Sequence, residues 1–316
     1  MKKTSNGSPY STSSLSTLPL STPLNIGIIG LGAIGCLISS QLPTSINIYA
    51  LPRSAKSQNC SFQLISGNTS QDYQWPVWQG ERMDIVILCC KASQCKEALQ
   101  QWSSAISQET QIVLLQNGLG QHEELLNTFP HHAIFAASTT EGAFRSQPNI
   151  VTHAGKGQTQ WGFYGGVEQK FKLPLGLLKG DHHWSEDIKQ VLLDKLAINA
   201  TINPLTVKYQ CKNGELLILE DALSDLKALC EETEHFFQKM HWSISFSLFE
   251  KSQLIAQLTA NNFSSMLQDV KNKRPTEIDF INGYLLNTAI VNDFKLPISE
   301  SLINLVKSYE LEKKVC

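Results

Sequence analysis

Three glycines near the start of the chain have the spacing of a nucleotide-binding turn. Gly30, Gly32 and Gly35 form the pattern G-x-G-x-x-G. The isoleucine-rich run before them predicts a short buried strand, and residues 36–42 predict the first turns of a helix. In that context the first glycine makes the tight turn, the second lets the backbone approach a pyrophosphate, and the third lets helix and strand pack closely. A glycine-rich turn without a ligand is the alternative, but the flanking elements favour a dinucleotide, bound by Gly30, Leu31, Gly32, Ala33, Ile34 and Gly35.

A cation stands at the position that distinguishes the two nicotinamide cofactors. Where this kind of fold selects NAD, an Asp or Glu about 20 residues beyond the glycines binds the ribose 2′-hydroxyl. Residues 36–60 contain no acid, and Arg53 follows the strand expected at 46–50. Since a guanidinium suits a 2′-phosphate, NADP is favoured over NAD. A solvated arginine on a loop is the alternative.

A second group of polar residues lies in a stretch with helical periodicity. Lys195, Asn199 and Asn203 are spaced i, i+4 and i+8, so they share one face of a helix. We expect this helix at 187–203 and expect Pro204 to end it. Polar groups are unfavourable inside a core unless they are hydrogen-bonded, whereas they suit the wall of a polar cleft. A lysine there could donate a proton to a carbonyl oxygen and stabilise the negative charge that develops on it.

Two more candidates follow predicted strands. Lys91 comes directly after the apolar run 84–90, which is typical of a parallel strand covered on both faces. Asn117 follows the strand predicted at 111–115. Both residues should lie at the carboxyl edge of the sheet, where open α/β folds bind their ligands. Asn117 could bind the nicotinamide ribose or the substrate, or could be a simple turn residue.

Two residues of the C-terminal region have structural alternatives. Pro275 stands where a helix expected at 276–291 can begin, and Glu277 in its first turn would be favourable for the helix dipole. Ser265 could likewise be only a helix-terminus serine. Spacing alone therefore assigns neither residue to a site.

The order of the predicted elements indicates two domains. Residues 131–164 are β-rich and should extend the N-terminal sheet, whereas the periodicity becomes helical from about Trp184. We predict an α/β protein with an N-terminal Rossmann-type dinucleotide-binding domain at 24–186 and an all-α C-terminal domain at 187–316. The Ser/Thr-rich residues 1–23 should form a disordered tail. Further helices are expected at 92–105, 222–240, 248–258, 262–272 and 300–313, and short strands at 60–80.

Composition excludes several classes of function. The 316 residues carry a formal net charge of −2 with no basic block, which argues against a nucleic-acid partner. No apolar run is long enough to suggest a membrane span. The eight cysteines form no C-x-x-C pair and no Cys/His ligand spacing, so we expect no metal site and a reducing cytoplasm.

From about Asn25 to Lys313 the chain resembles the ketopantoate reductase (2-dehydropantoate 2-reductase) family. The matching motifs from residue 195 onward are far more specific than the glycine loop. The resemblance is carried by GLGAIG at 30–35, Lys91, QNGLG at 116–120, KLAINATINPLT at 195–206, NGEL at 213–216, SSMLQD from 264 and TEIDFINGYLL from 276.

This resemblance implies a role for each candidate residue. It implies a catalytic lysine at Lys195 and an active-site glutamate at Glu277. The contacts that it implies with the substrate are Asn117, Lys195, Asn199, Asn203 and Ser265, and those with NADP(H) are Arg53, at the 2′-phosphate, Lys91 and Asn117.

The implied activity is NADPH-dependent reduction of 2-dehydropantoate to (R)-pantoate in pantothenate and coenzyme A synthesis. The implied enzyme is a monomer or a homodimer with a small-molecule substrate. Reduction of another 2-oxo or 3-oxo acid is one alternative, and a non-catalytic NADP-binding regulator is another. Ketol-acid reductoisomerase chemistry would require magnesium and clustered carboxylates, for which the sequence offers no convincing group.

Overall fold

The computed structural model describes residues 23–54 and 58–311. The tail expected at 1–23 therefore lies, apart from its last residue, outside the described residues. No helix in the described ranges is long and apolar enough to cross a membrane.

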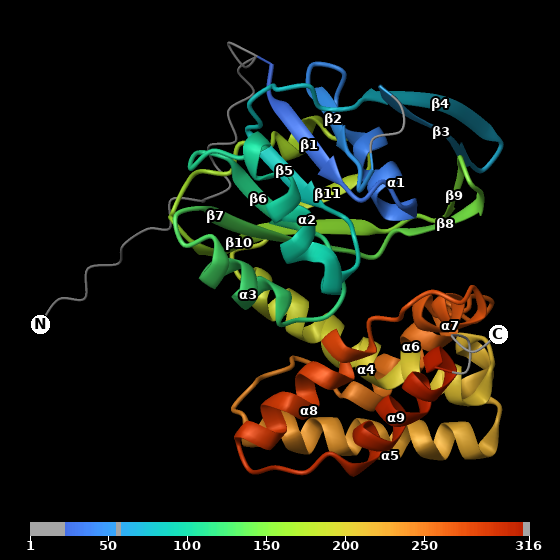
Figure 1. Cartoon of the computed structure of the whole chain (residues 1–316). Coiled ribbons are helices and arrows are strands. Elements are labelled where there is room, and N and C mark those ends of the chain that lie inside the picture. Colours follow the sequence, from blue (N-terminus) through green and yellow to red (C-terminus); the bar gives the residue numbers. More distant parts are fainter. Residues whose placement is uncertain (1–22, 55–57, 312–316) are drawn as a thin grey trace, which may run out of the picture. The chain divides into compact units, whose positions relative to one another are not determined.

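The described chain divides into two compact units, whose elements are labelled in Figure 1. The first unit contains the residues up to Gln116 and the segment Gln121–Lys189. The second contains the residues from Gln190 onward and, in addition, the short loop Asn117–Gly120. The loop is thus assigned to a different unit from the strand that precedes it and the helix that follows it.

A largely parallel sheet forms the centre of the first unit. In the described part of the chain it has seven strands, in the order β11 (Asp181–Trp184), β10 (Gln158–Gly166), β7 (Ala133–Thr139), β6 (Gln111–Leu114), β5 (Ile85–Leu88), β1 (Asn25–Ile29) and β2 (Asn47–Leu51). Neighbours from β7 to β2 pair in parallel, whereas β10 is antiparallel to β7. Every residue of β5 and β6 is buried, which explains why β5 is entirely apolar and β6 is apolar after Gln111.

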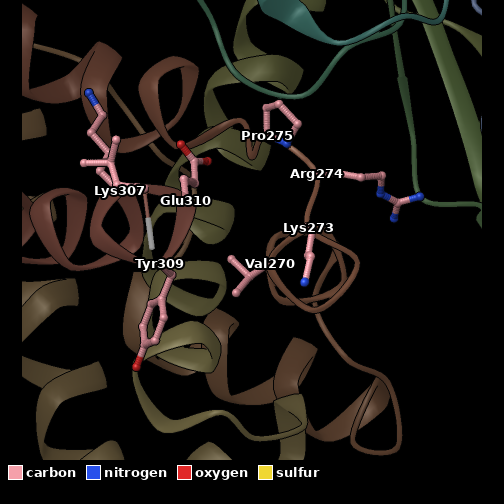
Figure 2. A pocket seen from close by; sticks show the side chains of 8 residues that line it. Val270, Lys273, Arg274, Pro275, Lys307, Tyr309 and Glu310 are labelled. Carbon is pink, nitrogen blue, oxygen red and sulfur yellow. The ribbon is translucent and has the colours of Figure 1, made fainter. Parts of the chain in front are cut away.

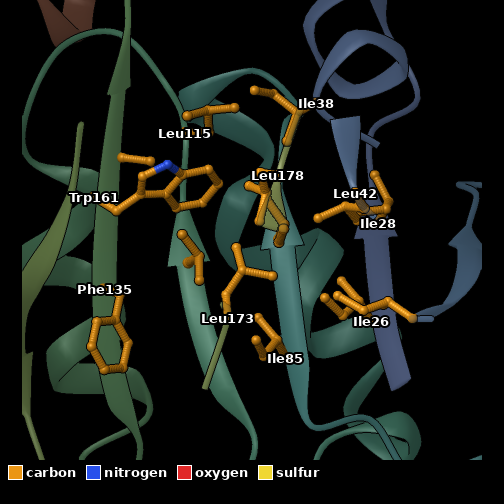
Figure 3. Close-up of a cluster of buried hydrophobic side chains, with 14 of the residues drawn as sticks. Ile26, Ile28, Ile38, Leu42, Ile85, Leu115, Phe135, Trp161, Leu173 and Leu178 are labelled. Carbon is orange, nitrogen blue, oxygen red and sulfur yellow. The ribbon is translucent and has the colours of Figure 1, made fainter. Parts of the chain in front are cut away.

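The core of this sheet holds the strand that leads into the glycine turn. Ile26 and Ile28 of β1 pack in one cluster with Ile85, Phe135 and Trp161 from other strands of the sheet (Figure 3). All five side chains are fully buried. Because β1 is fixed in this way, the turn after Ile29 begins at a defined point on the carboxyl edge of the sheet.

A second sheet corrects one expectation about the β-rich region. It contains, among the described residues, β4 (Thr69–Pro76), β3 (Asn59–Ser66), β9 (Ile150–Gly155) and β8 (Gly142–Gln147), in that order. The expectation that all strands between 131 and 164 extend the first sheet is wrong for β8 and β9, although it holds for β7 and β10. Local periodicity predicts that a segment is extended, but the partner is set by distant residues: β9 pairs in parallel with β3.

Two helices of the first unit differ from the expectation. The helix after the glycine turn, α1 (Ala33–Gln41), starts inside the glycine pattern. The helix predicted at 92–105 is interrupted, because it consists of the 3₁₀ turns η2 (Ala92–Gln94) and η3 (Ser103–Ala105) on either side of α2 (Cys95–Gln101). The unit also contains α3 (Gln121–Thr128) and η4 (Leu175–Leu177).

The second unit is helical where it is described. One expectation is wrong here, because the predicted helix at 276–291 is broken at Ile281, whose φ of −105° and ψ of −90° are not helical. Glu277 therefore precedes a 3₁₀ turn instead of lying inside an α-helix. The elements are α4 (Ile188–Tyr209), η5 (Asn213–Leu217), α5 (Glu220–Lys239), α6 (Leu248–Leu258), α7 (Ser265–Lys271), η6 (Ile278–Phe280), α8 (Asn282–Val291) and α9 (Pro297–Leu311).

Helix α4 does not end at Pro204, contrary to the expectation, but continues to Tyr209. A proline inside a helix lacks the N–H that would bond to the carbonyl four residues earlier, here that of Ala200. In the structure this carbonyl accepts a hydrogen bond of 2.9 Å from Nδ2 of Asn282, which is fully buried. Asn282 thus supplies the donor that Pro204 lacks.

Replacing Asn282 with alanine should lower the free energy of unfolding by about 1–3 kcal/mol, since it leaves a buried carbonyl without a donor. Urea denaturation measures this loss. Asn292→Ala is the matched control, because Asn292 also donates to a backbone carbonyl, that of Thr288, but from an exposed position. Equal losses in the two variants would contradict the role assigned to Asn282.

Candidate active site

The glycine turn has the geometry that a bound pyrophosphate requires. Gly30 has a φ of +90°, and a Cβ added there would lie 2.5 Å from the backbone nitrogen of Cys90. A Cβ on Gly35 would lie 2.1 Å from the carbonyl oxygen of Gly30, so only glycine allows α1 to pack this closely. A Cβ on Gly32 would have no neighbour within 4 Å, which leaves the approach to the first turn of α1 open. That turn contains no acidic residue, so nothing opposes an anion at the helix N-terminus.

Arg53 lines a cavity beside this turn. The cavity has a volume of about 550 Å³, and its wall includes Gly30, Leu31, Arg53 and Arg145. Arg53 is exposed two residues after the end of β2, and its carbonyl oxygen accepts a hydrogen bond of 3.0 Å from Gln101. The structure thus places the predicted phosphate-binding cation in the same cavity as the glycine turn.

Arg145 is a residue of this cavity that sequence reasoning missed. Its guanidinium donates to the carbonyl oxygens of Leu31 and Pro148, so it holds the glycine loop to β8. It lies more than 100 residues from the loop in sequence. No spacing rule connects such distant positions, so a pairing of β8 with the region of α1 would have had to be known first.

Lys91 lies at the carboxyl edge of the sheet, as expected, and the non-glycine residues of the glycine pattern lie at the start of α1. Lys91 is half-buried and stands just before η2, beyond the carboxyl end of β5. Because β5 pairs in parallel with β1, this end lies at the same edge of the sheet as the glycine turn. Leu31, Ala33 and Ile34 are half-buried in or next to the first turn of α1.

In the second unit, α4 presents the predicted polar residues. Lys195 and Asn199 are half-buried, and Asn203 is buried. Burial lowers the pKa of Lys195 to about 8, while the charge of Glu277 acts in the opposite direction. The lysine and the glutamate therefore interact through their charges, although they are 82 residues apart in sequence.

Asn117 lies beside the glutamate. Its Nδ2 donates to Oε2 of Glu277 over 3.3 Å. Two features of the same loop fix it there: Leu119 donates its N–H to the carbonyl oxygen of Phe280 over 2.8 Å, and a Cβ on Gly118, whose φ is +83°, would lie 2.2 Å from that oxygen. The sequence does not predict a role for Phe280, because only its backbone carbonyl contributes to the site.

Glu277 is buried, and the residues before and after it are held by hydrogen bonds and an ion pair. Before it, Arg274 bonds to Asp269 over 3.0 Å and the N–H of Thr276 donates to Glu310 over 2.7 Å. After it, Asp279 pairs with Lys307 over 2.6 Å. Figure 2 shows the small cavity next to this segment, of about 270 Å³, with Arg274 and the side chains of α9 in its wall. These bonds hold the glutamate in place without a helix around it.

The two serines at the start of α7, Ser264 and Ser265, have different positions. Ser264 caps the helix by accepting from the N–H of Leu267 over 3.1 Å, and its hydroxyl also bonds to that of Thr206 on α4 over 2.6 Å. Ser265 is exposed as the first residue of the helix. Ser265 is thus a helix-terminus serine, as the structural alternative expects, whereas Ser264 supplies the cap.

Together these residues could perform acid–base chemistry at a carbonyl group. A lysine whose pKa is near 8 can give up its proton close to neutral pH, and a carboxylate and an amide lie near it. Within residues 23–54 and 58–311, no group of three or more His, Cys, Asp or Glu side chains could hold a metal ion.

Sequence comparison connects both parts of the chain with one family. The model described as Ketopantoate reductase PanE/ApbA matches residues 26–166, and the model described as Ketopantoate reductase PanE/ApbA C terminal matches residues 187–310. A relative from Vibrio cholerae serotype O1, named 2-dehydropantoate 2-reductase, is 30% identical over 297 residues, which are 91% of this chain and 98% of the relative.

Solved structures share the fold. The crystal structure of probable 2-dehydropantoate 2-reductase panE from Bacillus subtilis is similar with a TM-score of 0.79 and 27% identity, over 91% of this chain and all of the other. The ternary structure of D-mandelate dehydrogenase with NADH and anilino(oxo)acetate is similar with a TM-score of 0.81 and 22% identity, over 92% of this chain and 99% of the other. At that identity the second likeness concerns the fold alone.

Proposed function

Since the chain belongs to the ketopantoate reductase family, we propose that it reduces 2-dehydropantoate to (R)-pantoate with NADPH, with Lys195 as proton donor. The observation that supports this most directly is the lysine of lowered pKa, which α4 holds near the carboxylate of Glu277. The nicotinamide supplies the hydride, which no amino-acid side chain can provide.

The residues of the first unit bind the cofactor. The N–H groups at the start of α1 and the open space at Gly32 receive the pyrophosphate. Arg53 binds the 2′-phosphate with charge-assisted hydrogen bonds. Lys91, at the same edge of the sheet, adds positive charge for the phosphates, and Arg145 keeps the loop in position through the carbonyl of Leu31.

Lys195 acts at the carbonyl oxygen of the substrate. Its ammonium stabilises the negative charge that develops there and then transfers a proton, so that an alcohol forms. Glu277 orients the ammonium or accepts a hydrogen bond from the substrate hydroxyl, and it does not bind the substrate carboxylate, because the two anions repel each other. Asn117 holds one oxygen of Glu277 and so fixes the direction of the carboxylate.

Neutral side chains bind the polar ends of the substrate. Asn199 and Asn203 lie one and two helical turns beyond Lys195 on α4, and both offer an amide donor and an amide acceptor. Ser265 adds an exposed hydroxyl. We propose that these three groups position the carboxylate and the hydroxyl of 2-dehydropantoate.

The reaction should slow in alkaline solution. Only the protonated ammonium of Lys195 can donate, and its pKa is about 8, so kcat/KM should be constant below that pH and fall about tenfold per pH unit above it. Initial rates of NADPH oxidation across this range measure the effect. NADPH affinity measured over the same pH range is the control, and a parallel loss of affinity would assign the fall to cofactor binding.

The variant Glu277→Gln should move this alkaline limb to lower pH. The carboxylate raises the pKa of Lys195, so an uncharged amide of the same shape should let the pKa fall. The pH profile of kcat/KM measures the displacement. A limb that stays in place would show that Glu277 does not act on Lys195 through its charge.

The activity itself can be tested with pure protein and a panel of 2-oxo and 3-oxo acids. We expect NADPH oxidation with 2-dehydropantoate at a higher kcat/KM than with the other acids. A clear preference for another acid would assign the enzyme a different substrate, and binding of NADPH without oxidation with any acid would favour a regulator. Activity that persists in EDTA would exclude a magnesium-dependent reaction.

A reducing cytoplasm fits the state of the cysteines. Cys36, Cys211 and Cys230 are buried without a disulfide. Burial raises the pKa of Cys36 and of Cys211 to about 11 and that of Cys230 to about 12. Such thiols behave as small apolar side chains. We therefore propose that the enzyme acts in the cytoplasm. Its proposed partner is its small-molecule substrate.

A further inference from the structure

A second cavity of the first unit has features that the reductase reaction does not use. Its volume is about 830 Å³, and α1, β3, β4 and β9 contribute to its wall. The described residues that line it do not include any that line the cavity of Arg53. Ser66, Glu141 and His153 all line it.

These three side chains form a hydrogen-bonded series. Oγ of Ser66 lies 3.2 Å from Nδ1 of His153, and Nε2 of the same histidine lies 2.6 Å from Oε2 of Glu141. The side chain of Glu141 is only 4% exposed, and its position is set by the N–H of Gly157 at 3.1 Å and the amide of Gln41 at 3.3 Å. In this arrangement Ser66 is the nucleophile, His153 is the base and Glu141 orients the base. Such an arrangement activates a hydroxyl.

The surroundings determine which nitrogen of His153 carries the proton. Nε2 faces two acceptors, the carboxylate of Glu141 and the carbonyl oxygen of Gly155 at 3.1 Å, so in the neutral ring Nε2 must be the donor. Nδ1 is then the unprotonated nitrogen, and it faces the hydroxyl of Ser66. The imidazole is therefore held in the form that can take the proton of the serine.

We propose that Ser66, His153 and Glu141 form a second active site, in which Ser66 is an acyl acceptor for small esters. Oγ of Ser66 attacks the ester carbonyl while its proton moves to Nδ1 of His153. The bond to the leaving alcohol then breaks, and the alcohol takes that proton. Water, deprotonated by the same imidazole, hydrolyses the acyl-serine, so an ester and water give a carboxylic acid and an alcohol.

The wall of the cavity indicates the kind of ester. Lys156 and Lys179 line the cavity together with Asp181, and a lysine ammonium can stabilise the oxyanion of the tetrahedral intermediate. Oε1 of Gln41 is buried without a hydrogen-bond partner, and Gln41 lines this cavity. An unsatisfied buried acceptor is unfavourable, so a substrate with a hydroxyl or amide donor would be bound preferentially.

A fluorophosphonate probe tests the proposal on the full chain. It should attach to Ser66, with loss of fluoride, and peptide mass spectrometry should locate the adduct. Ser66→Ala should abolish this adduct, and His153→Gln should slow its formation roughly 10²-fold or more, the usual effect of losing a positioned base. Ser70→Ala is the matched control, because Ser70 is an exposed serine on the neighbouring strand β4, and labelling of Ser66 should be unchanged in it.

Two measurements separate this site from the reductase and from folding. Thermal unfolding should show that all variants fold. Ser66→Ala should retain NADPH-dependent reduction. The reductase activity and the labelling of Ser66 can therefore fail independently of each other. The same side chains also join β3 to β9. If Ser66 is not labelled in folded protein, or is labelled equally fast in His153→Gln, the three residues are only a structural network and the proposal is wrong.

Discussion

Replacing Lys195 with alanine should lower kcat/KM for 2-dehydropantoate roughly 10²-fold or more, which is the usual effect of losing a positioned acid. The variant also loses the positive charge that stabilises the developing oxyanion, so the loss should appear mainly in kcat. NADPH affinity should stay close to that of the unmodified protein, because the glycine turn and Arg53 belong to the other unit. Steady-state kinetics and a fluorescence titration with NADPH measure the two quantities.

Lys189→Ala is the matched control for this experiment. Lys189 lies on the same helix, is exposed, and stands over the ring of Tyr164, so its loss removes a lysine without touching the proposed site. It should leave kcat/KM almost unchanged. A Lys195→Ala protein that folds and keeps near-normal kcat/KM would move the proton donor to another residue or to water.

A double-mutant cycle extends the same prediction to Glu277. Glu277→Ala should also reduce turnover, because it removes the group that orients Lys195 and raises its pKa. If the two residues act as one unit, the double variant loses less than the sum of the single losses. Strictly additive losses would mean that they act independently.

Replacing Arg53 with alanine should weaken NADPH binding roughly 10- to 100-fold, since a hydrogen bond to a charged group contributes about 1.5–3 kcal/mol. NADH lacks the 2′-phosphate, so its affinity should change little and the preference for NADPH should largely disappear. Titration of both cofactors measures this change in selectivity. Equal affinities for NADPH and NADH in the unmodified protein would contradict the assignment of the 2′-phosphate site.

Arg82→Ala provides the control for Arg53. Arg82 is an exposed arginine that pairs with Glu109 and does not line the cavity beside the glycine turn. Its removal changes the net charge by the same amount. If it weakened NADPH binding as much as Arg53→Ala does, the effect would come from overall charge and not from a specific phosphate contact.

Features that depend on neighbouring residues could be predicted from the sequence. The glycine turn is an example, because the turn, the strand before it and the helix after it all lie within residues 25–41. The shared face of Lys195, Asn199 and Asn203 is another, since helical periodicity alone determines it. The two-part α/β organisation follows from the same local patterns.

Features that depend on distant residues could not be predicted. Pro204 is a helix breaker by local rules, and only the buried amide of Asn282 makes it tolerable inside α4. Glu277 was expected inside a helix, but ion pairs and hydrogen bonds to α7 and α9 hold it in a non-helical segment. The pairing of β9 with β3 is likewise a contact over a long sequence separation.

The assignment of Asn117–Gly120 to the helical unit limits how this gene could be divided. A fragment that begins near residue 187 would fold without Leu119, whose N–H satisfies the carbonyl of Phe280, and without the amide that holds Glu277. The fragment that ends there would carry the loop but lack its binding partners. Recombination that exchanges the C-terminal half between relatives must therefore preserve the match between two segments about 160 residues apart. The halves are adjacent in sequence, but the C-terminal half depends on a loop that lies within the N-terminal half.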